Sequence, residues 1–190
     1  MASFSSRAPV LAALALAACG GGSSSSGVDI RSLVPADGDV SGWTQDSTLA
    51  VVPGSRAGDP SDAVLNSSVD GDADVFQEAG LAQLAVQPYR KGSDEVMSLR
   101  IWQMDSAAAA QQAFDGLPGH GRYQQSWNAC VPSIGEACRI ANVQNAQGDD
   151  YWWVTTRKKT YIVEGIVTPN SDTADDDAIA FLQVVLAKIP

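Results

Sequence analysis

Asp70, Asp72 and Asp74 alternate along the chain, and alternating carboxylates are one ingredient of a calcium site. A hard cation needs several oxygen ligands that converge from one turn. An EF-hand loop starting at Asp70 would require a glycine where Val75 stands and a bidentate acid where Leu81 stands, so that specific motif fails. A looser calcium site stays open beside a plainer interpretation, in which these acids cap a helix and keep the surface soluble.

His120 is the single histidine and the other candidate for acid–base chemistry. It stands between two glycines, and no Gly-x-Ser-x-Gly motif accompanies it as a nucleophile. We therefore interpret it as a loop histidine. A hydrolase would instead need a cleft that collects acidic side chains such as Asp70, Asp72, Asp74 and Glu164. The sequence favours a protein without catalytic activity and predicts no cofactor.

Tryptophans offer a different chemistry, that of ligand or partner binding. Trp152 and Trp153 are adjacent in a predicted strand, so their side chains should point to opposite faces of the sheet. One can fill the core, and the other is harder to bury. An exposed ring beside Tyr151 suits a sugar or a partner protein. We expect a ligand or partner face around Trp102, Trp152 and Trp153, with coverage of that face by a helix or loop as the alternative.

The N-terminal residues have the order of a secretory signal peptide. Arg7 precedes an apolar stretch, Val10 to Ala18, which is shorter than the roughly 20 residues of a membrane-spanning helix. The stretch leads into Leu16-Ala17-Ala18-Cys19, which resembles the lipobox of bacterial lipoproteins. That resemblance implies a signal peptide over residues 1–18 and attachment of diacylglycerol, with fatty acids such as palmitate, to Cys19. The alternative is an ordinary secreted protein in which Cys19 is incidental.

Residues 19–27 are then the lipidated cysteine and a Gly/Ser tether, whose mean random-coil reach is about 15 Å. The expected partner of Cys19 is a lipid bilayer. In enteric-type sorting, an aspartate directly after the lipidated cysteine favours retention at the inner membrane. This chain has Gly20 at that position, so we expect the outer membrane in an organism that has one. Removal of residues 1–18 takes away Arg7 and leaves 11 basic against 22 acidic side chains, a formal charge of −11. Such a surface repels nucleic acid and anionic headgroups.

Cys130 and Cys138 remain as an even pair in an exported chain. Pro132 and Gly135 lie between them and predict a turn that brings the flanking segments face to face. We predict a disulfide, which stabilises by about 2 to 3 kcal/mol in the chain-entropy model. A redox or metal-binding pair is the alternative, but the spacing is not Cys-x-x-Cys and no histidine lies close.

Residues 28–190 suit a single globular α+β domain with a mainly antiparallel sheet of two hairpin groups. Strands are predicted over residues 43–52, 81–90, 95–104, 137–143, 151–157 and 160–168. Helices are predicted over residues 62–80 and 106–117, and at the C-terminus after a cap at Ser171 or Thr173. The Ala-rich helix 106–117, with Ser106 as its cap, and the C-terminal helix should pack on the sheet.

Side-chain periodicity predicts which faces are buried. In the strand 95–104, Met97, Leu99 and Ile101 share a core face. Ser98, Arg100 and Trp102 share the other face, which we expect to be partly wet. The C-terminal helix should bury the apolar stripe Ala178, Phe181, Leu182, Val185 and Ile189.

From Trp43 to Phe114 the order of short motifs resembles an uncharacterised bacterial family, domain of unknown function 6599. The motifs are Gly42-Trp43, Asp70-Gly71-Asp72-Ala73-Asp74-Val75-Phe76, Gly80-Leu81, and Leu99 to Asp105 entering Ser106 to Phe114. In that family the second motif is closer to Asn-Gly-Gly-Ala-Asp, and an acid often stands where this chain has Arg100. The resemblance implies the fold and no activity.

Together these features favour a membrane-anchored cell-envelope lipoprotein whose domain binds an envelope protein or a glycan. A periplasmic hydrolase that uses acidic residues and a calcium-binding module are the two alternatives.

Overall fold

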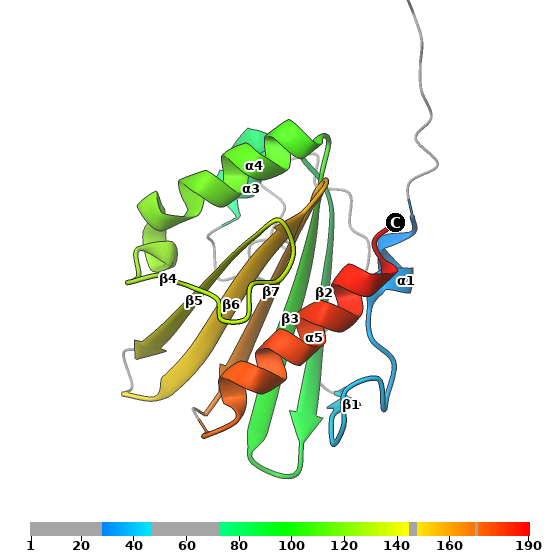
Figure 1. Ribbon diagram of the computed structural model, residues 1–190, viewed down its shortest axis with the longest axis vertical. Helices are drawn as coiled ribbons and strands as arrows, with labels where there is room; N and C mark the ends of the chain where they lie inside the picture. Colours follow the sequence, from blue (N-terminus) through cyan, green and yellow to red (C-terminus); the bar gives the residue numbers. More distant parts are fainter. Residues whose placement is uncertain (1–27, 47–72, 145–147, 170) are drawn as a thin grey trace, which may run out of the picture.

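The computed structural model describes residues 28–46, 73–144, 148–169 and 171–190 (Figure 1). Its helices are α1 (Ile30–Leu33), α3 (Asp74–Ala79), α4 (Ala107–Gly116), η1 (Leu117–Gly119), η2 (Gly121–Tyr123) and α5 (Ala174–Lys188). Its strands are β1 (Thr44–Gln45), β2 (Leu81–Lys91), β3 (Glu95–Met104), β4 (Asn128–Ala129), β5 (Ala137–Gln144), β6 (Asp150–Lys158) and β7 (Tyr161–Thr168).

The strands in the described residues form one sheet in the order β1-β2-β3-β7-β6-β5-β4. Every neighbouring pair is antiparallel. Hairpin β2–β3 and the β5–β6–β7 group meet where β3 pairs with β7, in a register that places Arg100 opposite Glu164. The predicted α+β fold, with a mainly antiparallel sheet of two hairpin groups, is confirmed.

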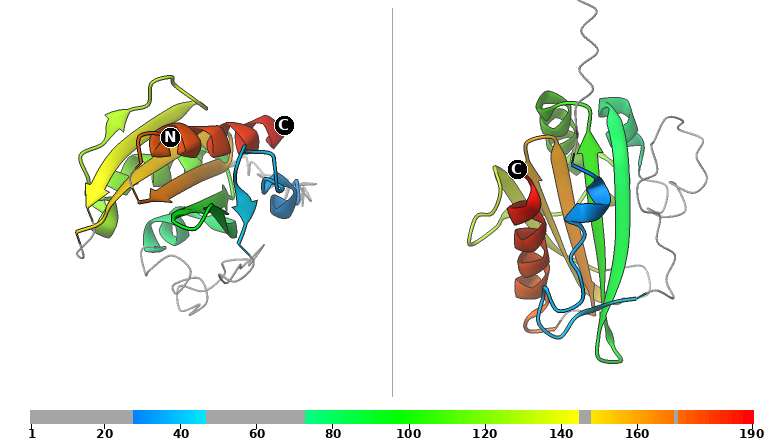
Figure 2. Two further views of the ribbon diagram at one scale, coloured as in Figure 1. Left: turned by 90° about the horizontal axis from the view of Figure 1, so that it is seen from below. Right: turned by 90° about the vertical axis from the view of Figure 1, so that its right-hand side faces the viewer.

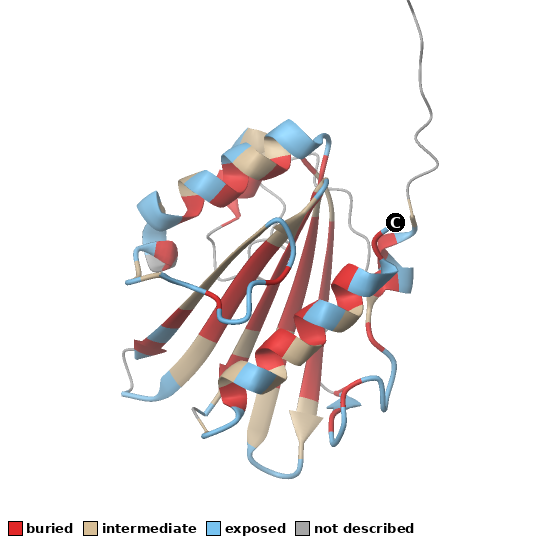
Figure 3. Cartoon of the chain, in the orientation of Figure 1, coloured by how far each residue is buried: buried red, intermediate tan, exposed pale blue. Residues whose placement is uncertain are grey.

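Helices cover both faces of this sheet, with α5 on one face and α3 and α4 on the other (Figures 1 and 2). Met97, Leu99 and Ile101 pack under α5, as predicted. Trp102 packs on the opposite side with residues of α3 and α4, and Arg100 is only 5% exposed. Ser98 on this face stays half-buried, so the face is partly wet only at that end. At Arg100 and Trp102 the expectation of a wet surface is wrong, because α3, α4 and the segment after α4 cover that part of the sheet (Figure 3).

Local signals position the elements around the sheet. Gly92 supplies the positive φ of 64° in the β2–β3 turn, and Gly80 ends α3 with a φ of 99°. The hydroxyl of Ser106 accepts a hydrogen bond from the backbone N–H of Ala109 at 3.1 Å, so the predicted cap of α4 is confirmed.

Helix α5 buries the whole predicted stripe from Ala178 to Ile189. Its N-cap position is Thr173, one of the two predicted, but neither the Thr173 hydroxyl nor the Ser171 hydroxyl accepts a helix N–H, so the predicted position is confirmed and no side-chain cap is formed. Asp175, Asp176 and Asp177 lie in its first turn instead, where carboxylates interact favourably with the positive end of the helix dipole.

Several predictions fall outside the described residues. They concern the signal peptide, Cys19, the tether, Asp70, Asp72, the end of the strand 43–52 and the start of the helix 62–80. Within the described part, only Thr44 and Gln45 of the predicted strand form a strand, β1, and only Asp74–Ala79 of the predicted helix are helical, as α3.

Candidate functional site

A disulfide joins Cys130 and Cys138, with a Cα–Cα distance of 5.5 Å. Cys130 follows β4 and Cys138 lies in β5, and these two strands pair antiparallel through Asn128–Ile140 and Ala129–Arg139. The predicted disulfide is confirmed, and so is the prediction that the turn brings its flanking segments face to face.

The loop closed by this disulfide is fixed against β6. The Thr156 hydroxyl donates to the carbonyl oxygens of Ile134 and Ala137, at 3.0 and 2.9 Å. Glu136 binds the backbone N–H of Lys159 at 3.1 Å, and this hydrogen bond, helped by the charge of Arg157, holds the pKa of the Glu136 carboxyl below its usual value. The loop is therefore a rigid structural element of the domain.

Two of the three tryptophans predicted to form a partner face are buried. Trp102 is 0% and Trp153 is 1% exposed. The Phe76 ring of α3 stacks on Trp102 with centroids 3.7 Å apart, and Tyr123 and Trp127 pack on Trp153. The prediction that Trp102 and Trp153 lie on an accessible face is therefore wrong, because helix and loop residues cover both rings.

Beneath these rings, three polar side chains cross the middle of the sheet in one row. They are Thr155 of β6, Glu164 of β7 and Arg100 of β3, which are register partners on neighbouring strands. We call them the polar row. All three are buried, with exposures of 0%, 0% and 5%. Such a row in an otherwise apolar face is the most concentrated polar chemistry among the buried residues of the described chain.

Glu164 is the centre of this arrangement. Its Oε2 atom accepts hydrogen bonds from Trp102 Nε1 at 2.8 Å and from the Tyr123 hydroxyl at 3.2 Å. Its Oε1 atom and the Thr155 hydroxyl have no hydrogen-bond partner within the described residues. Arg100 of β3 and Thr155 of β6 are the cross-strand register partners of Glu164 on either side.

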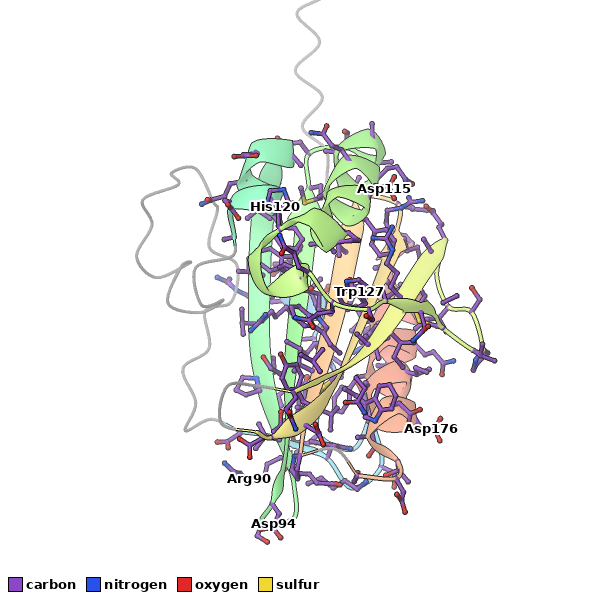
Figure 4. The ribbon with its side chains drawn as sticks, turned by 90° about the vertical axis from the view of Figure 1, so that its left-hand side faces the viewer. Arg90, Asp94, Asp115, His120, Trp127 and Asp176 are labelled. Atoms are coloured by element: carbon purple, nitrogen blue, oxygen red, sulfur yellow. A yellow bond between two sulfur atoms is a disulfide. The ribbon has the colours of Figure 1, made fainter. Side chains whose placement is uncertain are left out.

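Residues 117–129, here called the strap, run from the end of α4 to β4; His120 and Trp127 mark their course across the sheet in Figure 4. Tyr123 binds Glu164, and Trp127 Nε1 donates to the Tyr123 carbonyl oxygen at 2.8 Å. The strap ends where the disulfide begins, so it is held at its centre by a carboxylate and at its end by a covalent bond. Sequence reasoning missed this role of Tyr123; the position of Glu164 inside an otherwise apolar strand is the signal that could have indicated a buried hydrogen-bond donor.

Trp152 is the one member of the predicted face that keeps an accessible surface. It is half-buried on the α5 side of the sheet, opposite to Trp153 as predicted, with Asn142 and Val167 as its cross-strand neighbours. Asn142 is exposed. In the described chain, β4 pairs with β5 only at Arg139 and Ile140, so the outer edge of β5 beyond Ile140 has no described strand partner.

Of the acidic candidates, the structure describes Asp74 and Glu164, and these two do not come together in one accessible cleft. Asp74 is exposed in the first turn of α3, and its Oδ1 atom accepts a hydrogen bond from the Val75 N–H at 2.9 Å; the N-cap residue is Ala73, so Asp74 does not cap the helix. Glu164 is buried. Across the ranges that the structure describes, no group of three His, Cys, Asp or Glu side chains is arranged to hold a metal ion. His120 lies between η1 and η2 and is half-buried.

We compared the chain with known proteins. No family model matches it, so the similarity to domain of unknown function 6599 stays a prediction. No curated protein matches it either. Among solved structures it is similar to the extracellular domain of PknH from Mycobacterium tuberculosis, with 10% identity over 82% of this chain and 94% of that chain. The TM-score is 0.46, and a similarity at this level carries no argument about fold or function.

Among the helices of the described residues, none has the length and apolar character needed to cross a membrane.

Proposed function

We propose that this chain is a lipid-anchored protein of the cell envelope whose folded domain acts by binding a partner. The pairing of Cys130 with Cys138 is the observation that supports this proposal most directly. A stable disulfide suits an exported domain, because the cytosol keeps thiols reduced. The sequence has three cysteines, so the disulfide leaves Cys19, at the end of the lipobox-like segment, as the one cysteine for another chemical fate.

Attachment of lipid to the Cys19 thiol would hold the domain at a membrane surface. Two or more acyl chains, each gaining about 0.8 kcal/mol per buried methylene, hold a protein stably at a bilayer. The outer membrane, in an organism that has one, is the proposed location, because Gly20 follows the cysteine.

Cys19→Ser tests the anchor. In cells fed a labelled fatty acid, the wild-type chain should take up the label and sediment with membranes, and Cys19→Ser should lose both properties. The matched control is Cys130→Ser combined with Cys138→Ser, which removes the disulfide and should keep label and membrane association. Unchanged membrane association of Cys19→Ser would overturn the proposed anchor.

For the binding activity, the surface around Trp152 and the outer edge of β5 is the best supported. An unpaired strand edge accepts an extended segment through backbone hydrogen bonds, and a neighbouring aromatic ring adds contact area. Trp152 and Asn142 lie side by side there. We propose an envelope protein as the partner, and a glycan, which also stacks on aromatic rings, is the other outcome of the test.

A photoreactive residue placed at Asn142 tests this surface in intact cells. Irradiation should capture one defined partner at Asn142, and the additional change Trp152→Ala should reduce that capture several-fold. The control position is Gln183, which is exposed on α5. Equal capture at Asn142 and Gln183, or capture that Trp152→Ala does not change, would contradict binding at this edge.

A further inference from the structure

The first described residue lies at one end of the long axis of the domain, next to the C-terminus. Val28 lines a hollow together with Ile189, Pro190 and the β6–β7 turn residues Lys159 and Thr160. Figures 1 and 2 show the C-terminus and this turn toward the same end, with α1 extending from there toward the middle of β2. We call it the anchor end, since the tether joins the domain there.

The opposite end consists of β1, the β2–β3 turn, the start of β6 and the connection from β7 to α5. Figure 4 shows Arg90, Asp94 and Asp176 there, and Asp115 and His120 at the other end. We call it the far end. Strand β2 connects the two ends: its first residue, Leu81, pairs with Met104 near the anchor end, and its last, Lys91, pairs with Glu95 in the turn of the far end.

Charge is divided very unequally between the two ends. The far end holds ten acids, Asp37, Asp46, Asp94, Glu95, Asp149, Asp150, Asp172, Asp175, Asp176 and Asp177, against the two bases Arg90 and Lys91. The anchor half holds seven described acids, Asp29, Asp39, Asp74, Glu78, Asp105, Asp115 and Glu136, against the six bases Arg31, Arg139, Arg157, Lys158, Lys159 and Lys188. Nearly all excess negative charge of the described residues therefore lies at the far end.

From this geometry we propose that the anchor end faces the lipid surface and that the acidic far end is held away from it. The inference rests on the proposed attachment of lipid to Cys19. It assigns the lipid headgroup layer as the surface that the anchor end meets.

Chain length disfavours the inverted orientation. From Cys19 to Val28 the chain makes nine Cα–Cα steps, which span at most about 32 Å when fully extended, and its mean random-coil reach is only about 15 Å. Val28 lines the same hollow as Ala82, at the start of β2. The nine steps from Ala82 to Lys91 cover about 30 Å at about 3.3 Å per residue. With the far end on the bilayer, the tether would therefore have to be stretched to nearly its full length.

The negative charge of the far end disfavours an orientation in which the domain lies with its long axis parallel to the bilayer. Anionic headgroups repel the far end when it comes within the Debye length, about 8 Å at physiological ionic strength. The described residues outside the far end are nearly neutral in sum, so anionic headgroups do not repel them comparably. Tether length and charge asymmetry thus favour the same orientation.

The orientation can be measured on vesicles. The mature chain, with its disulfide intact, is coupled through Cys19 to a maleimide lipid in vesicles of phosphatidylcholine with a third of phosphatidylglycerol. A fluorophore is placed at Asp94 in one sample and at Asp115 in the other; both are exposed acids, so the charge change is the same. Energy transfer to a dye in the bilayer should be several-fold stronger from Asp115 than from Asp94. Equal transfer, or stronger transfer from Asp94, would overturn the proposed orientation.

A second chain with a doubled Gly/Ser tether, in vesicles of phosphatidylcholine alone, is the control. Longer reach and loss of the headgroup charge should bring the two transfer efficiencies closer together, and an unchanged difference would contradict both causes. Because the lipid is attached chemically, the result does not depend on whether cells modify Cys19. A failure of the orientation is thereby distinguished from a failure of the proposed anchor.

Discussion

At the residue scale, the most informative group is the Glu164 carboxylate. A carboxyl group at 0% exposure is costly to bury unless hydrogen bonds compensate for the lost water. Trp102 and Tyr123 donate to the same oxygen, and Arg100 stands opposite on the neighbouring strand. The carboxylate thus connects the sheet to the strap that covers it.

Replacement of Glu164 separates hydrogen bonding from simple burial. Glu164→Leu should lower the free energy of unfolding by about 3 kcal/mol, because the buried Trp102 and Tyr123 donors both lose their acceptor. Glu164→Gln keeps an acceptor oxygen for both donors and should lower it by less than half as much. Urea unfolding curves of both variants measure the difference. A leucine variant at least as stable as the glutamine variant would refute the bonding role.

A second residue-scale prediction concerns Gly135 in the disulfide loop. Its φ is 66°, and an added Cβ would lie 2.6 Å from the carbonyl oxygen of Arg157. Gly92 has nearly the same φ, 64°, but open space around it. Gly92→Ala should therefore destabilise by about 1 kcal/mol from backbone strain alone, and Gly135→Ala by about 3 kcal/mol. Thermal unfolding of the two variants gives the comparison, and equal losses would mean that the close approach does not matter.

At the element scale, sequence patterns and observed elements agree where local chemistry decides and differ where packing decides. The β2–β3 hairpin depends on the conformational freedom of Gly92, and α4 begins at the Ser106 hydroxyl, so both follow from a few adjacent residues. Helix α5 is stabilised in another way. Its apolar stripe is buried against the sheet, and no side chain caps its first turn. An alternating pattern such as that of β3 shows which residues share a face, but not which distant segment covers that face.

Two matched substitutions test the difference between the helices. Ser106→Ala removes a hydroxyl that accepts the Ala109 N–H and should lower the free energy of unfolding by about 1 kcal/mol. Thr173→Ala occupies the same N-cap position of α5 but removes no bond to a helix N–H, so it should change stability by only a few tenths of a kcal/mol. Denaturant unfolding compares the variants, and similar losses for both would show that the α5 cap is stronger than its geometry indicates.

At the scale of the whole molecule, charge asymmetry is the dominant feature. The formal net charge of −10 for the full chain is a single number, and the fold decides where that charge lies. Strand ends and helix starts bring Asp94, Asp150 and Asp176 to one end from three distant parts of the sequence. Mutual repulsion of such charges destabilises the compact state and is screened by salt.

Salt should therefore stabilise the wild-type domain more than a chain with fewer acids at the far end. Between 20 and 500 mM potassium chloride, the free energy of unfolding of the wild type should rise by on the order of 1 kcal/mol. The triple change Asp94→Asn, Asp150→Asn and Asp176→Asn should raise stability at low salt and reduce the salt effect. Parallel salt dependence of the two proteins would contradict repulsion at the far end.

The sequence by itself determined the features that depend on neighbouring residues. The α+β class, the β2–β3 hairpin, the cap of α4, the stripe of α5 and the disulfide each follow from spacing or from a count of cysteines, and the structure confirms them. Only the tertiary structure decided that Trp102 and Trp153 are buried, that Tyr123 binds Glu164, and that the acids gather far from Val28. Each of these depends on contacts between segments tens of residues apart, and strand register and helix packing set such contacts, which local patterns do not encode.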